Sequence, residues 1–202
     1  MPKIVDPDQR REAVVEALFR VIERDGLEQA SLRNVAAEAG LAIGSVRHYF
    51  EHHTELVVFA MKALSERLTT RLTSHVDRVR TAADPRGAVV DMLAELLPVD
   101  ERRTRETAVW LAFLMASRTR PELRPHADEL YDGLVVLTTR ILEGARRGGR
   151  LTPDADLALE SRRLCALIDG LSLHAILHPD RLDAAAVLDV LRRHLDTLVA
   201  PA

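Results

Sequence analysis

The spacing of apolar residues constrains the fold of this chain more than any other feature of its sequence. Val15, Leu18, Phe19 and Ile22 lie at positions i, i+3, i+4 and i+7, which places their side chains on one face of an α-helix. Similar spacing recurs along most of the 202 residues, interrupted by single Pro and Gly residues. Aromatic residues make up only 3% of the chain, which favours packed helices over sheets. We therefore predict an all-α protein.

These interruptions divide the chain into nine predicted helices, three in front and six behind. The predicted helices cover approximately residues 7–24, 31–39, 42–48, 55–80, 85–97, 101–118, 121–147, 153–177 and 183–199. Side chains able to cap a helix precede three of them, at Ser31, Thr54 and Asp84. The joints are short, and we find no long flexible linker. We therefore expect two domains, formed by residues 1–53 and 54–202.

Charge and terminal sequence bear on the partners and location of the protein. The net charge of −3 argues against a protein that coats a polyanion, but a specific DNA reader needs only a few well-placed cations. The first residues, MPKIVDPDQRRE, lack the apolar stretch of a signal peptide, and no apolar run approaches the length that crosses a bilayer. We predict a cytoplasmic protein with no membrane partner. Cys165 is the single cysteine, and we expect it in a helical core, with a redox role as the alternative.

Residues 31–48 carry the pattern that points to function. A capped helix, a turn containing Gly40 and a second short helix form the helix-turn-helix arrangement, whose second helix enters the major groove of DNA. Taken alone, this pattern also fits any capped amphipathic helix followed by a turn. The spacing therefore makes DNA binding one of two open interpretations.

A family resemblance becomes specific at these residues. The stretch SLRNVAAEAGLAIGSVRHYF, residues 31–50, resembles the signature of the TetR (tetracycline-repressor) family, in which A-x-x-A-G-V-S-x-G-x-L-Y-x-Y-F follows a helix ending in Gly. Later stretches resemble the subgroup of betaine-responsive repressors: WLAF at 110–113, PEL at 121–123, LIDGL at 167–171 and HP at 178–179. The resemblance implies a regulator, usually a repressor, that binds palindromic operator DNA as a homodimer and is released by a small-molecule effector. It implies no cofactor and no enzymatic activity.

The residues expected to contact DNA lie on both helices of the motif and beside them. Arg47 can read a base edge, because its planar guanidinium matches guanine O6 and N7, or it can clamp a phosphate. Gly44 lacks a Cβ and would permit close approach of the backbone to a phosphate. Tyr49 is expected first to seat the second helix, with Val46 and Phe50. The expected contact residues are Ser31, Arg33, Ala42, Ile43, Gly44, Ser45, Arg47, His48, Tyr49 and His53.

Two positions depart from the family pattern. The family usually has Ser or Thr where this chain has Ala42, and Lys where it has His53. Any contribution of the His53 imidazole to phosphate binding would depend on its protonation, so we expect modest or pH-sensitive affinity. His48 and His52 also fit a His-x-x-x-His metal pattern, but we expect a helix break between them and predict no metal site.

The helices that follow the motif offer candidates for an effector pocket and a dimer interface. Large or adaptable side chains could form pocket walls, although ordinary packing produces the same apolar stripes. The candidates for the pocket are Met92, Trp110, Phe113, Met115 and Tyr131. The apolar stripes of the last two helices predict a dimer interface, with burial inside one chain as the alternative. The candidates for the interface are Leu164, Ile168, Gly170, Leu171, Leu191 and Leu195.

Two other classes of protein compete with a regulator. An all-α enzyme needs converging acid, base or nucleophilic groups, and we find no such motif among the His, Asp and Ser residues. A helical adaptor that no longer reads DNA would fit Ala42, His53 and the weak charge. DNA binding that is lost as salt rises would distinguish a regulator from this adaptor.

Overall fold

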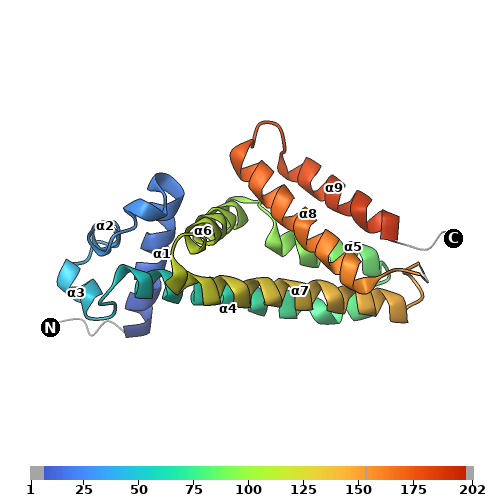
Figure 1. Cartoon of the computed structure of the whole chain (residues 1–202), viewed down its shortest axis with the longest axis horizontal. Coiled ribbons are helices and arrows are strands. Elements are labelled where there is room, and N and C mark those ends of the chain that lie inside the picture. The colour runs from blue at the N-terminus through green and yellow to red at the C-terminus, as the bar shows by residue number, and fades with distance from the viewer. Residues whose placement is uncertain (1–6, 153, 199–202) are drawn as a thin grey trace. The chain divides into compact units, whose positions relative to one another are not determined.

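The chain is helical throughout its regular structure, as the sequence predicts. The computed structural model describes residues 7–152 and 154–198, and within them it contains nine α-helices (Figure 1). These are α1 (Pro7–Asp25), α2 (Leu32–Glu38), α3 (Ile43–Arg47), α4 (His53–Thr81), α5 (Pro85–Leu93), α6 (Glu101–Ser117), α7 (Arg124–Arg147), α8 (Leu157–Leu177) and α9 (Ala184–Leu198). Three short 3-10 helices lie at Leu27–Gln29, Ala94–Leu96 and Pro121–Leu123. The predicted all-α fold is confirmed.

The described residues pack into two compact units. The first contains the chain up to Arg67 together with Ala108–Ala127, and the second contains Leu68–Thr107 and the chain from Asp128 onward. The first half of α4 belongs to the first unit, where Leu56 is fully buried. These units are defined by how the residues pack. The expected domains, residues 1–53 and 54–202, concern parts of the chain that fold independently, and they stay a prediction.

The first unit is built on the amphipathic helix that the sequence spacing indicates. The apolar face of α1 is buried, including Leu18 and Phe19, and α1 ends before Gly26, whose φ of 84° favours glycine. Ser31 caps α2, because its Oγ accepts a hydrogen bond from the Asn34 backbone N–H at 3.2 Å. Gly40, with φ of 66°, then turns the chain into α3. Both turns therefore use glycine where a side chain would be strained.

The core of the second unit is formed by α5, α7, α8 and α9. Leu93, Leu97, Leu142, Leu164 and Leu191 are among its almost completely buried side chains. Burial of a leucine side chain contributes about 1.5–3 kcal/mol relative to exposure, so this cluster accounts for much of the stability of the unit.

Four helix starts of this unit are fixed by aspartate caps. Asp84 accepts a hydrogen bond from the backbone N–H of Gly87, Asp100 accepts one from Arg103, and Asp183 accepts one from Ala186. Asp156 accepts hydrogen bonds from two backbone N–H groups at the start of α8. Each cap satisfies donors that have no partner inside the helix.

Two predicted helix starts were wrong. The expected cap Thr54 lies inside α4, which begins at His53, because the carboxylate of Glu55 accepts the backbone N–H groups of Glu51 at 2.9 Å and His52 at 3.4 Å. A glutamate three residues into a helix can satisfy these donors in place of a side-chain cap. The helix predicted from residue 153 begins instead at Leu157, after the Asp156 cap. Residues 153 and 199 lie outside the described part of the chain.

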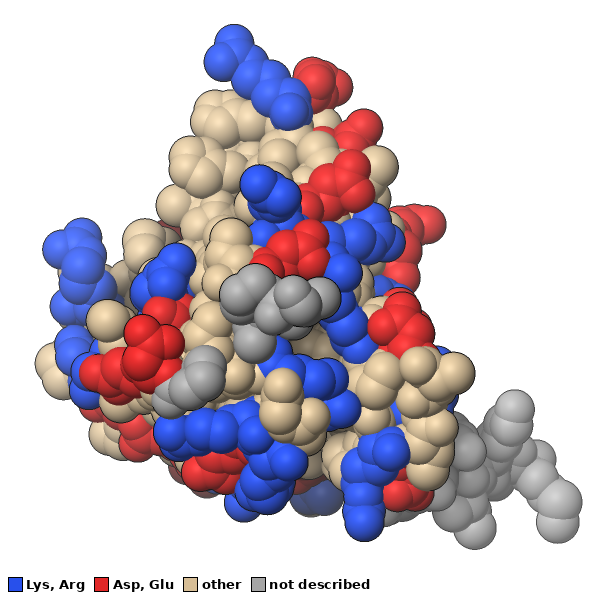
Figure 2. All heavy atoms as spheres, turned by 90° about the vertical axis from the view of Figure 1, so that its right-hand side faces the viewer, with Lys and Arg blue, Asp and Glu red and all other residues tan. Residues whose placement is uncertain are grey.

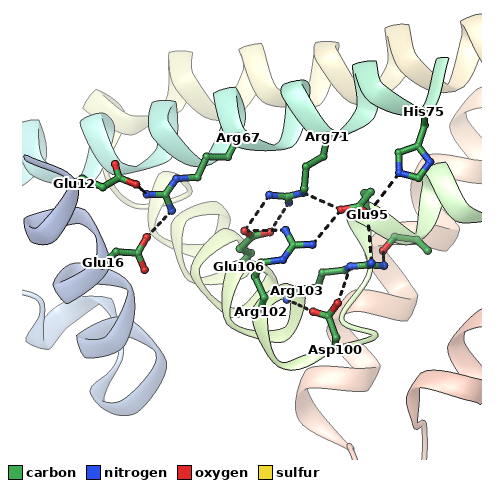
Figure 3. Close-up of polar contacts among 11 residues, drawn as sticks. Glu12, Glu16, Arg67, Arg71, His75, Glu95, Asp100, Arg102, Arg103 and Glu106 are labelled. Atoms are coloured by element: carbon green, nitrogen blue, oxygen red, sulfur yellow. Dashed lines mark hydrogen bonds and ion pairs between the residues drawn. The ribbon is translucent and has the colours of Figure 1, made fainter. Parts of the chain in front are cut away.

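Helix α4 carries ion pairs in each unit (Figure 3). In the first unit, Arg67 pairs with Glu16 at 2.6 Å and with Glu12. In the second unit, Arg71 pairs with Glu95 at 2.8 Å and with Glu106 at 2.6 Å. The glutamates come from α1 in the first unit, and from the 3-10 helix at Ala94–Leu96 and α6 in the second.

Glu95 is the centre of the larger of these networks. Besides Arg71 it pairs with Arg102 and Arg103, both at 3.3 Å, and its side chain is 9% exposed (Figure 3). Burial alone would raise the pKa of Glu95, but Arg103, Arg102 and Arg71 outweigh it and hold the pKa below its ordinary value. Glu95 is therefore ionised at neutral pH and binds three guanidinium groups.

Candidate functional site

The second helix of the motif, α3, is held in place by buried apolar side chains. Val46 is fully buried and Phe50, just after the helix, is almost so, with its ring 5.2 Å from the ring of Phe59 on α4. A helix of five residues has too few hydrogen bonds to persist alone, so this packing is what orders it. The expected seating role of Val46 and Phe50 agrees with this burial.

Anchoring of one side of α3 leaves its other side in solvent. Ala42, Gly44, Arg47 and His48 are exposed, while Ile43 and Ser45 are half-buried. The Arg47 guanidinium forms no ion pair with any residue in the described part of the chain, so a negatively charged partner could bind it without breaking an existing contact.

A hollow of about 560 Å³ lies between α2, α3 and the start of α4. Half of the ten residues expected to contact DNA line it, namely Ser31, Arg33, Ile43, Arg47 and His53. The fold thus brings together side chains from three helices on one surface. A phosphate or a base edge entering this hollow would meet two guanidinium groups and a hydroxyl.

Gly44 has no structural requirement within the chain. A Cβ built at this position would have no atom within 4 Å, apart from its own helix backbone and neighbours. Glycine inside a helix costs about 0.5–1 kcal/mol relative to alanine, so an external approach explains this residue better than internal packing does.

Tyr49 and His48 lie beside the hollow and do not line it. The guanidinium of Arg11 lies 5.4 Å from the centre of the Tyr49 ring, and the His48 ring packs against its edge at 5.2 Å. These contacts fix the Tyr49 ring, which is half-buried. Ala42 occupies the cap position of α3, where the family usually has Ser or Thr. Its methyl side chain cannot accept a hydrogen bond from the helix, so α3 begins without a side-chain cap.

The environment of His53 removes the charge that the family lysine would supply. Burial lowers the pKa of His53, and the nearby Arg120 guanidinium lowers it further. The Nε2 atom is buried without a hydrogen-bond partner among the described residues. His53 is therefore neutral at neutral pH in the free protein, and only acidic solution would charge it.

Sequence reasoning missed Arg120, which also lines the hollow and pairs with Glu28 at 2.7 Å. No local pattern connects these positions, because they are 92 residues apart in the chain. The guanidinium of Arg120 adds a third positive charge to this surface, partly balanced by Glu28.

The five expected pocket residues are divided between the two units. Met92 and Tyr131 belong to the second unit, and Trp110, Phe113 and Met115 belong to the first. Only Met92 lines the large cavity of the second unit; Phe113 is buried in the first unit, while Met115 is 65% and Tyr131 48% exposed. Their shared role in one pocket stays an untested prediction.

Five of the six residues expected at a dimer interface are buried within the single chain, and their interface role stays an untested prediction. Leu164, Ile168, Leu171, Leu191 and Leu195 are all buried in the core of the second unit, so they have almost no surface to offer a partner. Burial within one chain, the alternative to an interface, describes these five residues. Gly170, which is half-buried, is the exception.

The opposite side of the same two helices carries an apolar stripe that sequence reasoning did not select. On α8, Leu159, Ala166 and Leu173 are exposed at intervals of seven residues, followed by Leu177. Val190 is exposed on α9. A seven-residue apolar interval is typical of one helix packing along another.

The surroundings of His48, His52 and Cys165 bear on the metal and redox alternatives. The helix break expected between His48 and His52 is present, because α3 ends at Arg47 and α4 begins at His53. No group of three metal-ligating side chains occurs among the described residues. Burial raises the pKa of the Cys165 thiol, which lies in the core with Thr138 Oγ1 at 3.5 Å. A redox role for Cys165 gains no support from this environment.

No helix in the described ranges combines the length and the apolar character needed to cross a membrane. The predicted cytoplasmic location is not tested by this observation.

Comparison with known proteins identifies the family. The model of the BetI-type transcriptional repressor C-terminal domain matches residues 85–200. The HTH-type transcriptional regulator PksA of Bacillus subtilis is 36% identical over 198 residues, covering 98% of this chain and 94% of that protein. The HTH-type transcriptional regulator BetI of Stenotrophomonas maltophilia is 31% identical over 185 residues, which cover 88% of this chain and 86% of that protein. Such relatives are transcriptional regulators and not enzymes, which rules out the enzyme alternative.

Solved structures agree with these sequence comparisons. A transcriptional regulator from Rhodococcus sp. Rha1 has a TM-score of 0.80 and 31% identity, over 93% of this chain and 95% of that one. A regulator from Saccharomonospora viridis, solved in complex with choline, has a TM-score of 0.79 over 96% of this chain and 100% of that one. At 23% identity, the latter supports the fold alone. The chain belongs to the TetR family of transcriptional regulators, with a C-terminal domain of the BetI type.

Proposed function

We propose that the chain is a ligand-responsive repressor that binds a palindromic operator as a homodimer and is released by a small molecule. The observation that carries the proposal is the two-sided construction of α3. Val46 is buried in the first unit while Arg47 and Gly44 face solvent on the same five-residue helix. A helix fixed on one side and open on the other is suited to the major groove.

Contacts to the sugar-phosphate backbone would come from the start of α2. Arg33 is exposed and lines the same hollow as Arg47. The Ser31 oxygen accepts the Asn34 N–H, which leaves its hydroxyl proton free to donate to a phosphate oxygen. Arg47 would read a base or clamp a phosphate, and these alternatives predict different responses to substitution.

The homodimer would form through the outward stripe of α8 and α9, with Leu159, Ala166, Leu173 and Leu177 at its centre. An exposed apolar row of this kind is costly in water and is relieved by a second copy related by a two-fold axis. The half-buried Gly170 on the same helix would allow close approach of the two α8 helices.

An effector would act through α4. The choline complex of the Saccharomonospora viridis regulator supports a small molecule as the effector class, without naming it for this chain. α4 is a continuous helix from His53 to Thr81, and its C-terminal half lines the cavity of the second unit. A ligand that tilts α4 would change the distance between the two recognition helices, which must match half-sites about 34–36 Å apart or a multiple of that. The coupling must be reciprocal, so operator and effector weaken one another by the same factor.

Selection of binding sites from random double-stranded DNA tests the proposal. We expect enrichment of an inverted repeat, affinity that falls steeply with salt, and a dimer by sedimentation at the binding concentration. A control with Arg47→Ala is expected to enrich no repeat. Failure of the parent protein to enrich any sequence would instead favour the adaptor alternative.

A further inference from the structure

A cavity of about 1000 Å³ in the second unit lies along α4, α5, α7 and α9. Helix α4 presents one face to it, because its lining positions recur every three to four residues. Helix α7 contributes lining residues between Gly133 and Arg147, including the consecutive residues 141–145. Small-molecule sites usually have volumes of about 300–1,000 Å³, so this cavity could hold a molecule of substantial size.

The floor of the cavity is apolar and part of its apolar wall remains in water. Leu142, Leu195 and Leu198 are buried beneath it, while Val76 on α4 and Val136 on α7 are 44% and 47% exposed. Two exposed valines beside a buried leucine floor provide an apolar surface that the chain itself does not cover.

The charge around this cavity is strongly one-sided. Five of its lining residues are arginines and only Glu143 is acidic; the arginines are Arg80, Arg86, Arg140, Arg147 and Arg150. On the face drawn in Figure 2, Lys and Arg side chains lie in several groups with Asp and Glu side chains between them, so the excess of arginine belongs to the cavity lining. A ligand in the cavity therefore enters a region of positive potential.

Three of these arginines have no internal anionic partner. Arg147 pairs with Glu143 at 3.9 Å, and Arg86 pairs with Asp196 outside the cavity. Within the described ranges, Arg80, Arg140 and Arg150 form no ion pair, and all three are exposed.

Helix-end electrostatics explains only part of this arrangement. Arg80 and Arg147 lie in the last turns of α4 and α7, where a cation is stabilised by the helix dipole. The Arg150 guanidinium lies against Gly148, just after α7 ends, and also falls within reach of that effect. Arg140 lies two turns before the end of α7 and does not gain from it, so an external anion would account for Arg140.

A quaternary ammonium ion does not fit this lining. Such cations are bound by aromatic cages, and none of the residues that line the cavity is aromatic. The cavity of this chain thus differs in chemistry from a choline site. Guanidinium groups instead match carboxylate and phosphate oxygens.

We propose that this cavity binds an amphiphilic anion, a carboxylate or phosphate head on an apolar tail, with Arg140 and Arg150 at the head and the leucine floor at the tail. Binding of such an anion to the cavity does not depend on the proposed function. Only its consequence, that the bound anion regulates DNA binding, rests on the proposed function.

Calorimetric titration of the full chain with three ligands of one tail length tests the charge preference. The ligands are decanoate, decanol and decyltrimethylammonium, all below their critical micelle concentrations. We expect decanoate to bind once per chain, at least about tenfold more tightly than decyltrimethylammonium. A parallel titration with decyl phosphate identifies the preferred anionic head. Equal or tighter binding of the cation overturns the proposal.

Substitutions then locate the site. Arg140→Ala should weaken decanoate binding about threefold, and the Arg140→Ala/Arg150→Ala double variant about tenfold, while decanol binding is unchanged. Arg146→Ala is the matched control, since Arg146 lies on α7 outside the cavity lining. Gly133→Leu should weaken both ligands, because a side chain there has open space toward the cavity. Unchanged decanoate affinity in the double variant and in Gly133→Leu overturns the site.

DNA binding measured with and without decanoate is a separate test of the proposed function. If decanoate binds as described and leaves DNA affinity unchanged, the cavity assignment stands and the effector role of this cavity in the proposed function fails.

Discussion

Replacement of Arg47 by alanine tests the DNA-reading surface most directly. Arg47 is exposed on α3 and forms no internal ion pair with the described residues, so its removal should leave the fold intact. A bidentate contact to guanine contributes about 1–3 kcal/mol per half-site, and a dimer has two half-sites. We therefore expect operator affinity to fall by about 2–6 kcal/mol, or roughly 30-fold to more than 10,000-fold. Fluorescence anisotropy with the selected operator measures this loss.

A second substitution at the same position separates the two roles that remain open. Arg47→Lys keeps the charge but loses the planar fork, so a phosphate clamp would survive it and a guanine reader would not. A lost phosphate contact should also reduce the salt slope by about one for each half-site, whereas a lost base contact should leave the slope unchanged. Operator binding by Arg47→Ala as tight as that of the parent, at equal salt, would refute the assignment of α3 as the reading helix.

Three further substitutions probe other parts of the molecule. Gly44→Ala should keep or raise thermal stability, because a Cβ meets no atom, yet weaken operator binding; equal binding would exclude close approach at this residue. Glu95→Gln should lower the unfolding free energy by about 3 kcal/mol at neutral pH. Since the pKa of Glu95 is depressed in the folded protein, its contribution is complete above the ordinary carboxyl pKa and is lost as pH falls through the folded value, so denaturant titrations of parent and variant should converge in acid. Leu173→Glu should convert the dimer to a folded monomer in sedimentation velocity, and a dimer of unchanged affinity would place the interface elsewhere.

The sequence predicted the local structure of the motif well because its signals are local. Ser31 caps α2 as expected, and Gly40 adopts the positive φ that the turn requires. Both depend on neighbours within a few residues. The start of α4 was mispredicted because the Glu55 carboxylate accepts the backbone N–H groups of Glu51 and His52, so the helix needs no cap from Thr54. The sequence contains both possible caps and does not show which one forms.

Long-range relations were less accessible. The position of Arg120 beside His53 arises from the fold and has no counterpart in local spacing. On α8, apolar residues occur on two sides, so periodicity could not show whether Leu164 or Leu173 faces the core. Leu164 is buried and Leu173 is exposed, so the interface proposed above uses the other side of α8 from the residues expected in the sequence.

The shortness of α3 has a consequence for the genetics of this regulator. Five residues cannot hold a helical conformation unaided, so the shape of the DNA-reading surface persists only while Val46 and Phe50 remain packed. A screen for loss of repression should therefore recover two kinds of mutant. Changes at Arg47 would abolish recognition by a well-folded protein, whereas changes at Val46 or Phe50 would abolish it by letting the proposed reading helix melt. The second kind should regain function at lower temperature.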